Sequence, residues 1–458
     1  MLAASVVLYL LVTLIIGYFA SKKVKSAADF AVAGRKLPFF MSTAALFATW
    51  FGSETILGST EEFLENGLIG IIEEPLGAAL CLIIVGLFYA RKMYRTNAYT
   101  FSDVFGTKFG RSAELVSAFV MIPSFFSWIA AQLIAMSMLF QLLFGMSFFE
   151  GVLVGTIFVV AYTAMGGMWA VSWTDAIQTS VIIIGLIVIL VYFLFESEVG
   201  EILANTPASK FELFDPQRMS WINWIGAWCT VGLGSVASQD VFQRVISAKN
   251  ERVAILSSLT SAFLYLVIGF LPILIVWIGS QNYPELYAAN KGNFISTLIF
   301  EKTPVWIKII YFGALISALM STASGAILAP ATVLAENVLR PIFPKKNLLI
   351  LLRVGVVIIA LLSALITFSQ TSIFELAGQA SAFSLVSVFI PFSFTLFYRK
   401  TTKTGVISGM LFGLIVWTIS EALIISIPSF LIGMVGSYLA VVVGNLVEHN
   451  FKKVHETA

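Results

Sequence analysis

Long apolar runs recur throughout this 458-residue chain, and they limit its fold more than any other feature. Each run is long enough for a helix to cross the hydrocarbon core of a bilayer. Charged residues make up 11% of the chain, whereas a soluble domain carries about 25%. The sequence therefore predicts an all-α polytopic membrane protein with short connections. The thirteen predicted spans are 3–20, 38–58, 67–90, 113–143, 148–165, 171–195, 221–240, 253–280, 304–335, 347–368, 373–398, 404–424 and 428–447.

Basic residues divide unevenly between the two sides of these spans. If the N-terminus lies outside, only five of the 27 Lys and Arg residues fall on the outer side and the other 22 on the inner side. Because basic residues favour the cytoplasmic side of membrane proteins, we predict the N-terminus outside and the C-terminus inside. The five outer residues are Lys210, Arg218, Lys291, Lys302 and Lys308.

The stretch AALFATWFGSETILGST (44–60) places polar residues in the middle of the second predicted span. An ionisable residue such as Glu54 is energetically costly on a lipid-facing helix at that depth. A helix that unwinds there frees backbone groups, which are tolerated only where they line a cavity. Secondary transporters hold their coupling ion and substrate at such breaks. The alternative is a glycine-kinked helix whose polar residues bond to neighbouring helices.

A second span, GAWCTVGLGSVASQD (226–240), is interrupted in the same way by glycines and polar residues. It lies five predicted spans after the first interrupted one. Two broken segments at this separation are what an inverted repeat of five plus five helices would give.

Five motifs follow one another along the chain and carry a resemblance to a known family. They are DFAVAGRKLP (29–38), AYTAMGGMWAVSWTDAIQ (161–178), FQRVISAK (242–249), ALISALMSTASGAILAPATVLAENV (314–338) and LFYRKTTKTGVISG (396–409). In this order and at this spacing they resemble the sodium–solute symporter family, whose members include proline, glucose, sialic acid and choline carriers. The choline carriers look the most similar around Ala48–Trp50 and around FQRV.

The resemblance implies the family fold, an inverted repeat of five plus five helices with one helix before it and two after. Residues 1–36 would form the leading helix and a cytoplasmic loop. Residues 37–400 would form the ten-helix transporter core, and residues 401–458 two trailing helices and a cytoplasmic tail.

A sodium site is the first chemical expectation. Sodium is a hard cation that accepts neutral oxygen ligands. The adjacent hydroxyls of Ser321 and Thr322, with the carbonyl of Ala318 one turn earlier, offer three oxygens on one helix face. The resemblance adds the carbonyls of Ala48 and Phe51. The alternative is that both hydroxyls bond back to the preceding helical turn.

Asp175 is an intramembrane carboxylate, which is functional by default. Together with Ser324 it would form part of a second sodium site of the kind that some family members have. Gly325 stands where those members carry a further hydroxyl. The alternative is that Asp175 caps the N-terminus of its helix.

Substrate contacts follow from the resemblance and from charge. Trp50, Trp128 and Gln379 match positions that line the central cavity in relatives, and aromatic faces attract cations. The acidic residues of the region suggest a cation or a zwitterion. The alternative is that both Trp side chains only pack between helices. The remaining substrate candidates are Glu54, Thr55 and Glu74.

The aromatic cage of the choline carriers is incomplete in this sequence. Ser238 stands where those carriers have a Trp, and Ala78 where they have a Tyr. Glu73 and Glu74 would act as an outer gate or share a proton with each other.

These expectations combine into a sodium-coupled symporter of the cell membrane that imports a small organic solute by alternating access. Its partners would be sodium, the solute and the lipid bilayer, and a monomer would suffice. The net charge of +2 gives no indication of nucleic-acid binding. No nucleophile–base pair, metal cluster or nucleotide loop indicates an enzyme. The alternative function is a transporter-like sensor that acts with a separate signalling partner.

Overall fold

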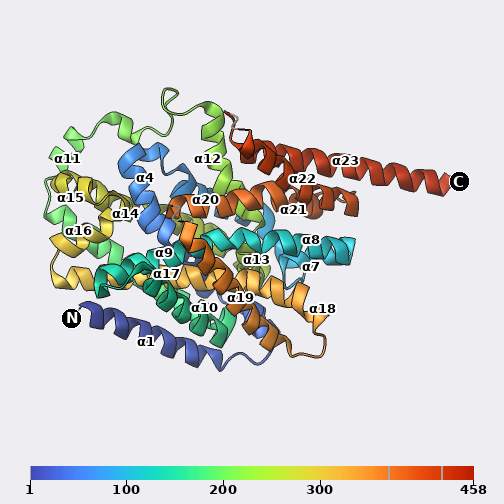
Figure 1. Ribbon diagram of the computed structural model, residues 1–458, viewed down its shortest axis with the longest axis horizontal. Coiled ribbons are helices and arrows are strands. Elements are labelled where there is room, and N and C mark those ends of the chain that lie inside the picture. The colour runs from blue at the N-terminus through green and yellow to red at the C-terminus, as the bar shows by residue number, and fades with distance from the viewer. Residues whose placement is uncertain (1, 370–371, 424–425, 458) are drawn as a thin grey trace.

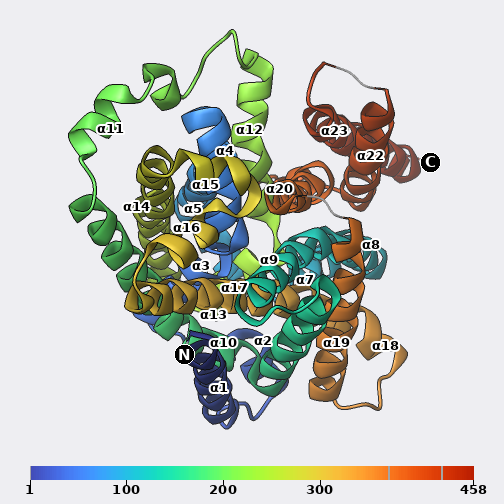
Figure 2. The same cartoon turned by 60° about the vertical axis from the view of Figure 1, so that its left-hand side comes forward.

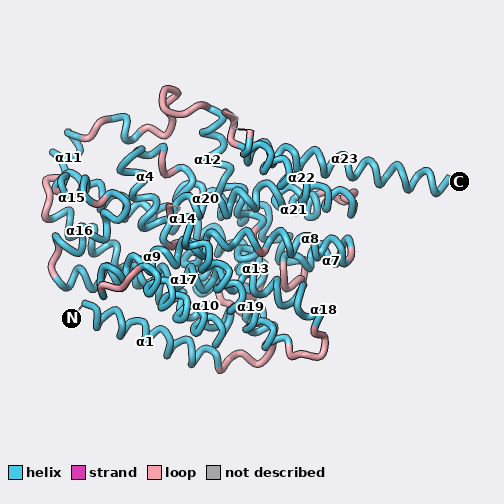
Figure 3. The backbone as a smooth tube through the Cα atoms, viewed as in Figure 1, coloured by secondary structure: helices cyan, strands magenta, loops and turns pink. Residues whose placement is uncertain are grey.

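The computed structural model describes residues 2–369, 372–423 and 426–457. The described chain is helical throughout, with no strand apart from one isolated bridge between Leu37 and Ala248. Figure 3 shows loops gathered at the two ends of the helices. The helices are α1 (Leu2–Ser21), α2 (Ala27–Val32), α3 (Phe39–Trp50), α4 (Ser59–Asn66), α5 (Ala78–Ile84), α6 (Ala90–Arg95), α7 (Phe101–Phe109), α8 (Arg111–Met121), α9 (Phe126–Phe144), α10 (Phe148–Phe195), α11 (Val199–Asn205), α12 (Trp221–Gly234), α13 (Gln239–Ser247), α14 (Glu251–Asn282), α15 (Pro284–Ala289), α16 (Phe294–Lys302), α17 (Val305–Val333), α18 (Arg340–Ile342), α19 (Leu348–Ile366), α20 (Ile373–Ser384), α21 (Ile390–Phe397), α22 (Lys403–Ala422) and α23 (Ser429–Thr457).

Within the described residues, ten helical segments are long and apolar enough to cross a membrane. The expectation of an all-α, multi-pass membrane protein is therefore confirmed. The segments are Leu2–Ser21, Ile72–Arg95, Arg111–Phe144, Phe148–Phe195, Glu251–Asn282, Val305–Ile342, Leu348–Ile366, Ile373–Phe397, Lys403–Ala422 and Ser429–Asn450.

The long helices run side by side between the two ends of the molecule (Figure 1), and α1 packs along α10 at one edge. Helices α22 and α23 pack against each other beside the main bundle (Figure 2). The centre is α17, since 94% of the residues in the most apolar stretch of the segment Val305–Ile342 are buried inside the protein. A spanning helix that is buried on all sides contacts protein rather than lipid, so its polar residues are free to serve a site.

The first predicted break is present. Helix α3 ends at Trp50, and a π-helical turn, η2 (Glu54–Gly58), leads into α4. The amide of Gly52 donates to the carbonyl of Trp50 at 2.9 Å. In a continuous helix that amide would bond to Ala48 four residues back. The Ala48 carbonyl is therefore left for a partner from another helix.

The second predicted break is also present. Helix α12 ends at Gly234, a 3₁₀ turn, η8 (Ser235–Ala237), follows, and α13 begins at Gln239 after the extended residue Ser238. An added Cβ at Gly234 would lie 2.3 Å from the carbonyl oxygen of Ser381 on α20, so only glycine permits this close approach. The two broken segments also meet, because α13 packs against α3.

Helix α10 contains one non-helical residue, Gly167, with φ 48° and ψ −143°. An added Cβ there would lie 2.4 Å from the backbone oxygen of Phe30 on α2. The turn therefore requires glycine for its conformation and for its neighbour. It divides α10 into two parts where the sequence predicts two spans, 148–165 and 171–195.

Candidate solute cavity and sodium site

Thr322 is the residue of α17 that faces the break after α3. Its hydroxyl donates to the free carbonyl of Ala48 at 3.2 Å. An added Cβ at Gly52 would lie 2.8 Å from the same hydroxyl oxygen. The structure therefore brings Thr322 to Ala48, two of the predicted sodium ligands.

Ser321 is turned away from Ala48. Its hydroxyl donates to Oδ1 of Asp175 on α10 at 2.5 Å. The two adjacent hydroxyls thus bond to different helices, and neither bonds back to the preceding turn of α17. Ala318 and Phe51, the other predicted sodium ligands, are fully buried.

Asp175 is buried inside the second part of α10 and does not cap a helix, so the capping alternative is wrong. Ser324, its predicted partner, instead donates to the carbonyl of Ser321 at 3.0 Å. Among the described residues, Oδ2 of Asp175 and Nη2 of Arg244 are buried without a hydrogen-bond partner. An added Cβ at Gly325 would lie 2.2 Å from Nη2 of Arg244. The guanidinium of Arg244 thus occupies the space that a side chain at position 325 would fill.

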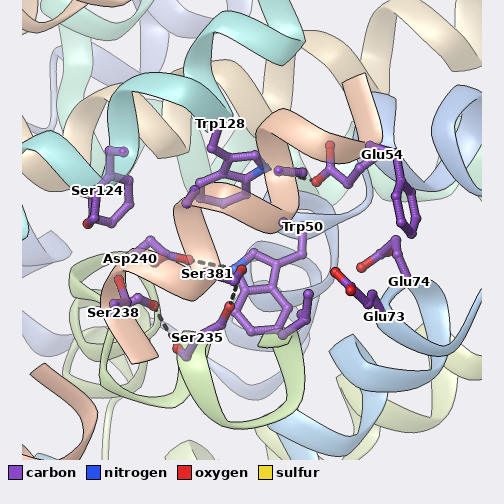
Figure 4. A pocket seen from close by; sticks show the side chains of 17 residues that line it. Trp50, Glu54, Glu73, Glu74, Ser124, Trp128, Ser235, Ser238, Asp240 and Ser381 are labelled. Carbon is purple, nitrogen blue, oxygen red and sulfur yellow. Dashed lines mark hydrogen bonds between the residues drawn. The ribbon is translucent and has the colours of Figure 1, made fainter. Parts of the chain in front are cut away.

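A cavity with about 60 Å³ of accessible volume lies beside the break that follows α3 (Figure 4). Four acidic side chains line it, and none of the described residues in its lining is a Lys, Arg or His. The lining residues are Trp50, Glu54, Glu73, Glu74, Ser124, Phe125, Trp128, Val231, Ser235, Ser238, Asp240, Phe374, Ala377, Gly378, Ala380, Ser381 and Ser384.

Glu54 is 5% exposed, and side chains of α9 hold its carboxylate. The indole of Trp128 donates to Oε1 at 3.0 Å, and the amide of Gln132 donates to Oε2 at 2.7 Å. Gln132 also accepts from the backbone amide of Ser53 at 2.9 Å. The unwound backbone is therefore tied to α9, and Trp128 does more than fill space between helices.

Glu74 is also buried and lines the same cavity. Its Oε1 accepts from the hydroxyl of Thr55 at 2.7 Å and also from the hydroxyl of Tyr265. The hydroxyl oxygen of Tyr265 also lies 2.7 Å from the carbonyl oxygen of Trp50, so its single proton serves one of these two acceptors at a time. Thr55 therefore positions Glu74 and is not itself part of the cavity lining. Within the described residues, no hydrogen bond joins Glu74 to Glu73.

The indole of Trp50 donates to Oδ2 of Asp240 on α13 at 2.6 Å. Asp240 lines the cavity, yet it is absent from the predicted site residues. The sequence does contain a signal, because Asp240 is an acidic residue at the end of the second interrupted segment.

Gln379 does not line the cavity, although its neighbours Gly378 and Ala380 do. Its side chain is exposed and donates to Glu375 at 3.2 Å. The helical rotation of α20 turns residue 379 away from the cavity that residues 378 and 380 reach.

Residues 30–413 match the Sodium:solute symporter family. The chain belongs to this family. The resemblance inferred from the motifs is therefore confirmed. The chain is a multi-pass membrane transporter and not an enzyme, and sodium is its coupling ion.

Relatives in this family have different substrates. The high-affinity choline transporter 1 of Caenorhabditis elegans is 25% identical over 459 residues, which cover 93% of this chain and 79% of that protein. The sodium/proline symporter of Escherichia coli (strain K12) is 26% identical over 467 residues, covering 93% of this chain and 90% of that protein.

Solved structures show the fold. A Na⁺-coupled sialic acid symporter in a substrate-bound, outward-open state matches with a TM-score of 0.84 at 19% identity, over 98% of both chains. A nucleobase-cation-symport-1 family transporter in a closed conformation matches with a TM-score of 0.57 at 14% identity, over 90% of this chain and 92% of that one.

Proposed function

We propose that this protein is a symporter that imports a small cationic or zwitterionic organic solute with sodium, by alternating access. The observation that carries the proposal is the cavity beside the break after α3, whose described lining has four acidic side chains and no basic one. An anion would be repelled there, whereas a cation gains charge-assisted hydrogen bonds. Trp50 and Trp128 add aromatic faces for the same cation.

The proposed sodium ligands are the carbonyls of Ala48, Phe51 and Ala318 and the hydroxyls of Ser321 and Thr322. The hydrogen bond from Thr322 to Ala48 supports this assignment, because the same two oxygens would turn to an ion placed between them. Hard cations prefer such oxygen ligands. No acidic residue belongs to this proposed set.

We propose that one sodium ion is bound per cycle. A second sodium at Asp175 and Ser324 has less support, because the guanidinium of Arg244 lies beside Gly325 and its charge acts on Asp175. A fixed cation at this place would repel a bound ion at close range. The hydroxyl of Ser324 also donates its proton to a backbone carbonyl of α17, that of Ser321.

The proposed substrate residues are Trp50, Glu54, Glu74 and Trp128, with Thr55 in a supporting role through its bond to Glu74. Gln379 is not among them, because its side chain is exposed outside the cavity.

The proposed architecture has thirteen spans, with the N-terminus outside and the C-terminus inside. This count takes the ten apolar segments, divides α10 at Gly167 and adds the interrupted segments α3–α4 and α12–α13. Residues 37–400 then form the core of five plus five helices, after a leading segment (1–36) and before two trailing helices and a tail (401–458). The proposed location is the cell membrane, with a monomer as the working unit.

In the proposed cycle, sodium binds between the end of α3 and α17 and fixes the break. A fixed break holds Trp50 and Glu54 at the cavity wall, which favours solute binding. Both ligands leave inward when α17 separates from Ala48. Separation of the two elements removes ligands from the ion and loosens the cavity wall in one step.

Uptake into proteoliposomes tests this function. An inward sodium gradient should drive accumulation of a solute found by a thermal-shift screen of the purified protein, and a potassium gradient should not. Solute binding that is stabilised by sodium, without any uptake, would favour the sensor alternative instead.

A further inference from the structure

Asp240 has one carboxylate oxygen held in place and one left free. It is 1% exposed, and Oδ2 accepts the 2.6 Å hydrogen bond from the Trp50 indole. Oδ1 accepts no hydrogen bond from any residue that the structure describes. Because Asp240 lines the cavity, the free oxygen is available to a solute there.

Arg244, one turn further along α13, does not pair with this carboxylate. Its Nε donates to the carbonyl of Ala45 and its Nη1 to the backbone carbonyl of Asp240, each at 3.1 Å. The guanidinium charge therefore acts on Asp240 without occupying either carboxylate oxygen. Among the described residues, Asp240 forms no salt bridge.

Hydroxyl groups surround the same part of the cavity. In the view of Figure 4, Asp240 lies with Ser235, Ser238 and Ser381 on one side of Trp50. The hydroxyls of Ser235 and Ser381 lie 3.0 Å apart, and Ser238 donates to the carbonyl of Ser235 at 2.8 Å. Each hydroxyl oxygen keeps acceptor capacity. This side of the cavity therefore offers several acceptors for N–H groups.

We propose that Asp240 determines substrate specificity, accepting an N–H from a protonated amine on the solute. A quaternary ammonium group has no N–H and would leave the free oxygen of Asp240 unpaired in a buried place. An ammonium with N–H groups forms a charge-assisted bond to Oδ1 and further bonds to the serine hydroxyls. The substrate class is then a primary or secondary amine. This inference rests on the proposed function, since it assigns the substrate of the same cavity.

Matched pairs of probes test the proposal on the purified full-length protein, at saturating sodium, by thermal shift and calorimetry. Each pair is an amine and its fully N-methylated form, for example ethanolamine with choline, and glycine with its trimethylammonium form. We expect at least one amine to bind about tenfold or more tightly than its quaternary partner, because a hydrogen bond to a charged group is worth that much. Tighter binding of every quaternary partner, or no amine binding at all, overturns the proposal.

The variant Asp240→Asn keeps an acceptor for the Trp50 indole but loses the negative charge. It should abolish most of the preference for the amine, while the sodium-dependent rise in melting temperature persists and proves that the variant is folded. Asp215→Asn, which removes a carboxylate from the exposed outer loop, should keep the preference. An unchanged preference in Asp240→Asn overturns the proposal. If Asp240→Asn does not fold, Asp240→Glu, which keeps the negative charge, is measured in its place.

Failure of the proposed function looks different. In that case sodium neither raises the melting temperature of the wild-type protein nor drives uptake, whatever the amine preference is.

Discussion

The hydroxyl of Thr322 on α17 lies 3.2 Å from the carbonyl oxygen of Ala48, the carbonyl that the break in the first segment leaves without its helical amide. This contact joins the most buried spanning helix to the end of α3. A cation bound between these two residues would break the hydrogen bond and take both oxygens, the hydroxyl of Thr322 and the carbonyl of Ala48, as ligands.

Thr322→Ala should weaken sodium binding about tenfold or more, because it removes an oxygen from the ion and leaves the fold intact. Thr322→Ser keeps the hydroxyl and should restore most of the affinity. The measurement is the sodium dependence of the melting temperature. Thr332→Ala, which removes a buried hydroxyl from the same helix away from the break, is the control. Equal sodium affinity in wild type and Thr322→Ala would refute the site.

Gly325→Ala should destabilise the protein by about 1–3 kcal/mol, because its Cβ would lie 2.2 Å from Nη2 of the buried Arg244 and overpack that space. Gly313→Ala on the same helix meets nothing within 4 Å, so it should be neutral or slightly stabilising. Thermal unfolding in one detergent compares the two. Similar melting temperatures for both variants would show that the guanidinium is not confined beside Gly325.

Glu54→Ala should cost about 1–3 kcal/mol of stability, since the donors of Trp128 and Gln132 would lose their shared acceptor in a buried place. Glu54→Gln keeps one carbonyl oxygen and should cost less. Chemical or thermal unfolding measures both changes. A smaller loss of stability in Glu54→Ala than in Glu54→Gln would mean that burying the carboxylate destabilises the fold by more than its hydrogen bonds stabilise it.

Reporter fusions after Ala458 test the orientation. We expect activity from a reporter that works only in the cytoplasm, and none from one that works only outside, because 22 of the 27 basic residues then lie inside. The reverse result would invert the proposed topology and the direction of transport with it.

Much of the fold could be predicted because membrane insertion leaves few choices. Apolar runs must become helices, since backbone polar groups need partners inside the bilayer. The glycines of the stretches 52–58 and 226–240 indicated the two breaks, because glycine interrupts a helix at low steric cost. The exact bounds were less predictable, as shown by α10, where the sequence predicts a gap over 166–170 and the structure has one non-helical residue, Gly167.

The site was predicted less completely. Glu54, predicted as an intramembrane carboxylate, and Trp128, predicted from the resemblance, both line the cavity and are hydrogen-bonded to each other. Asp240 was not predicted, because a sequence does not reveal which side chain the indole of Trp50 will reach. Gln379, also predicted, lies outside the cavity lining, because a one-residue rotation on α20 decides whether a side chain enters the cavity.

The short segment from Ala48 to Glu54 contributes to both the proposed ion site and the wall of the cavity. If both ligands require the same conformation of this backbone segment, the first ligand to bind already orders it. The second ligand then loses less conformational entropy on binding. Thermodynamic linkage then makes the effect symmetrical: the factor by which sodium tightens solute binding equals the factor by which solute tightens sodium binding. A substitution in this segment that changes one of these factors therefore changes the other by the same amount.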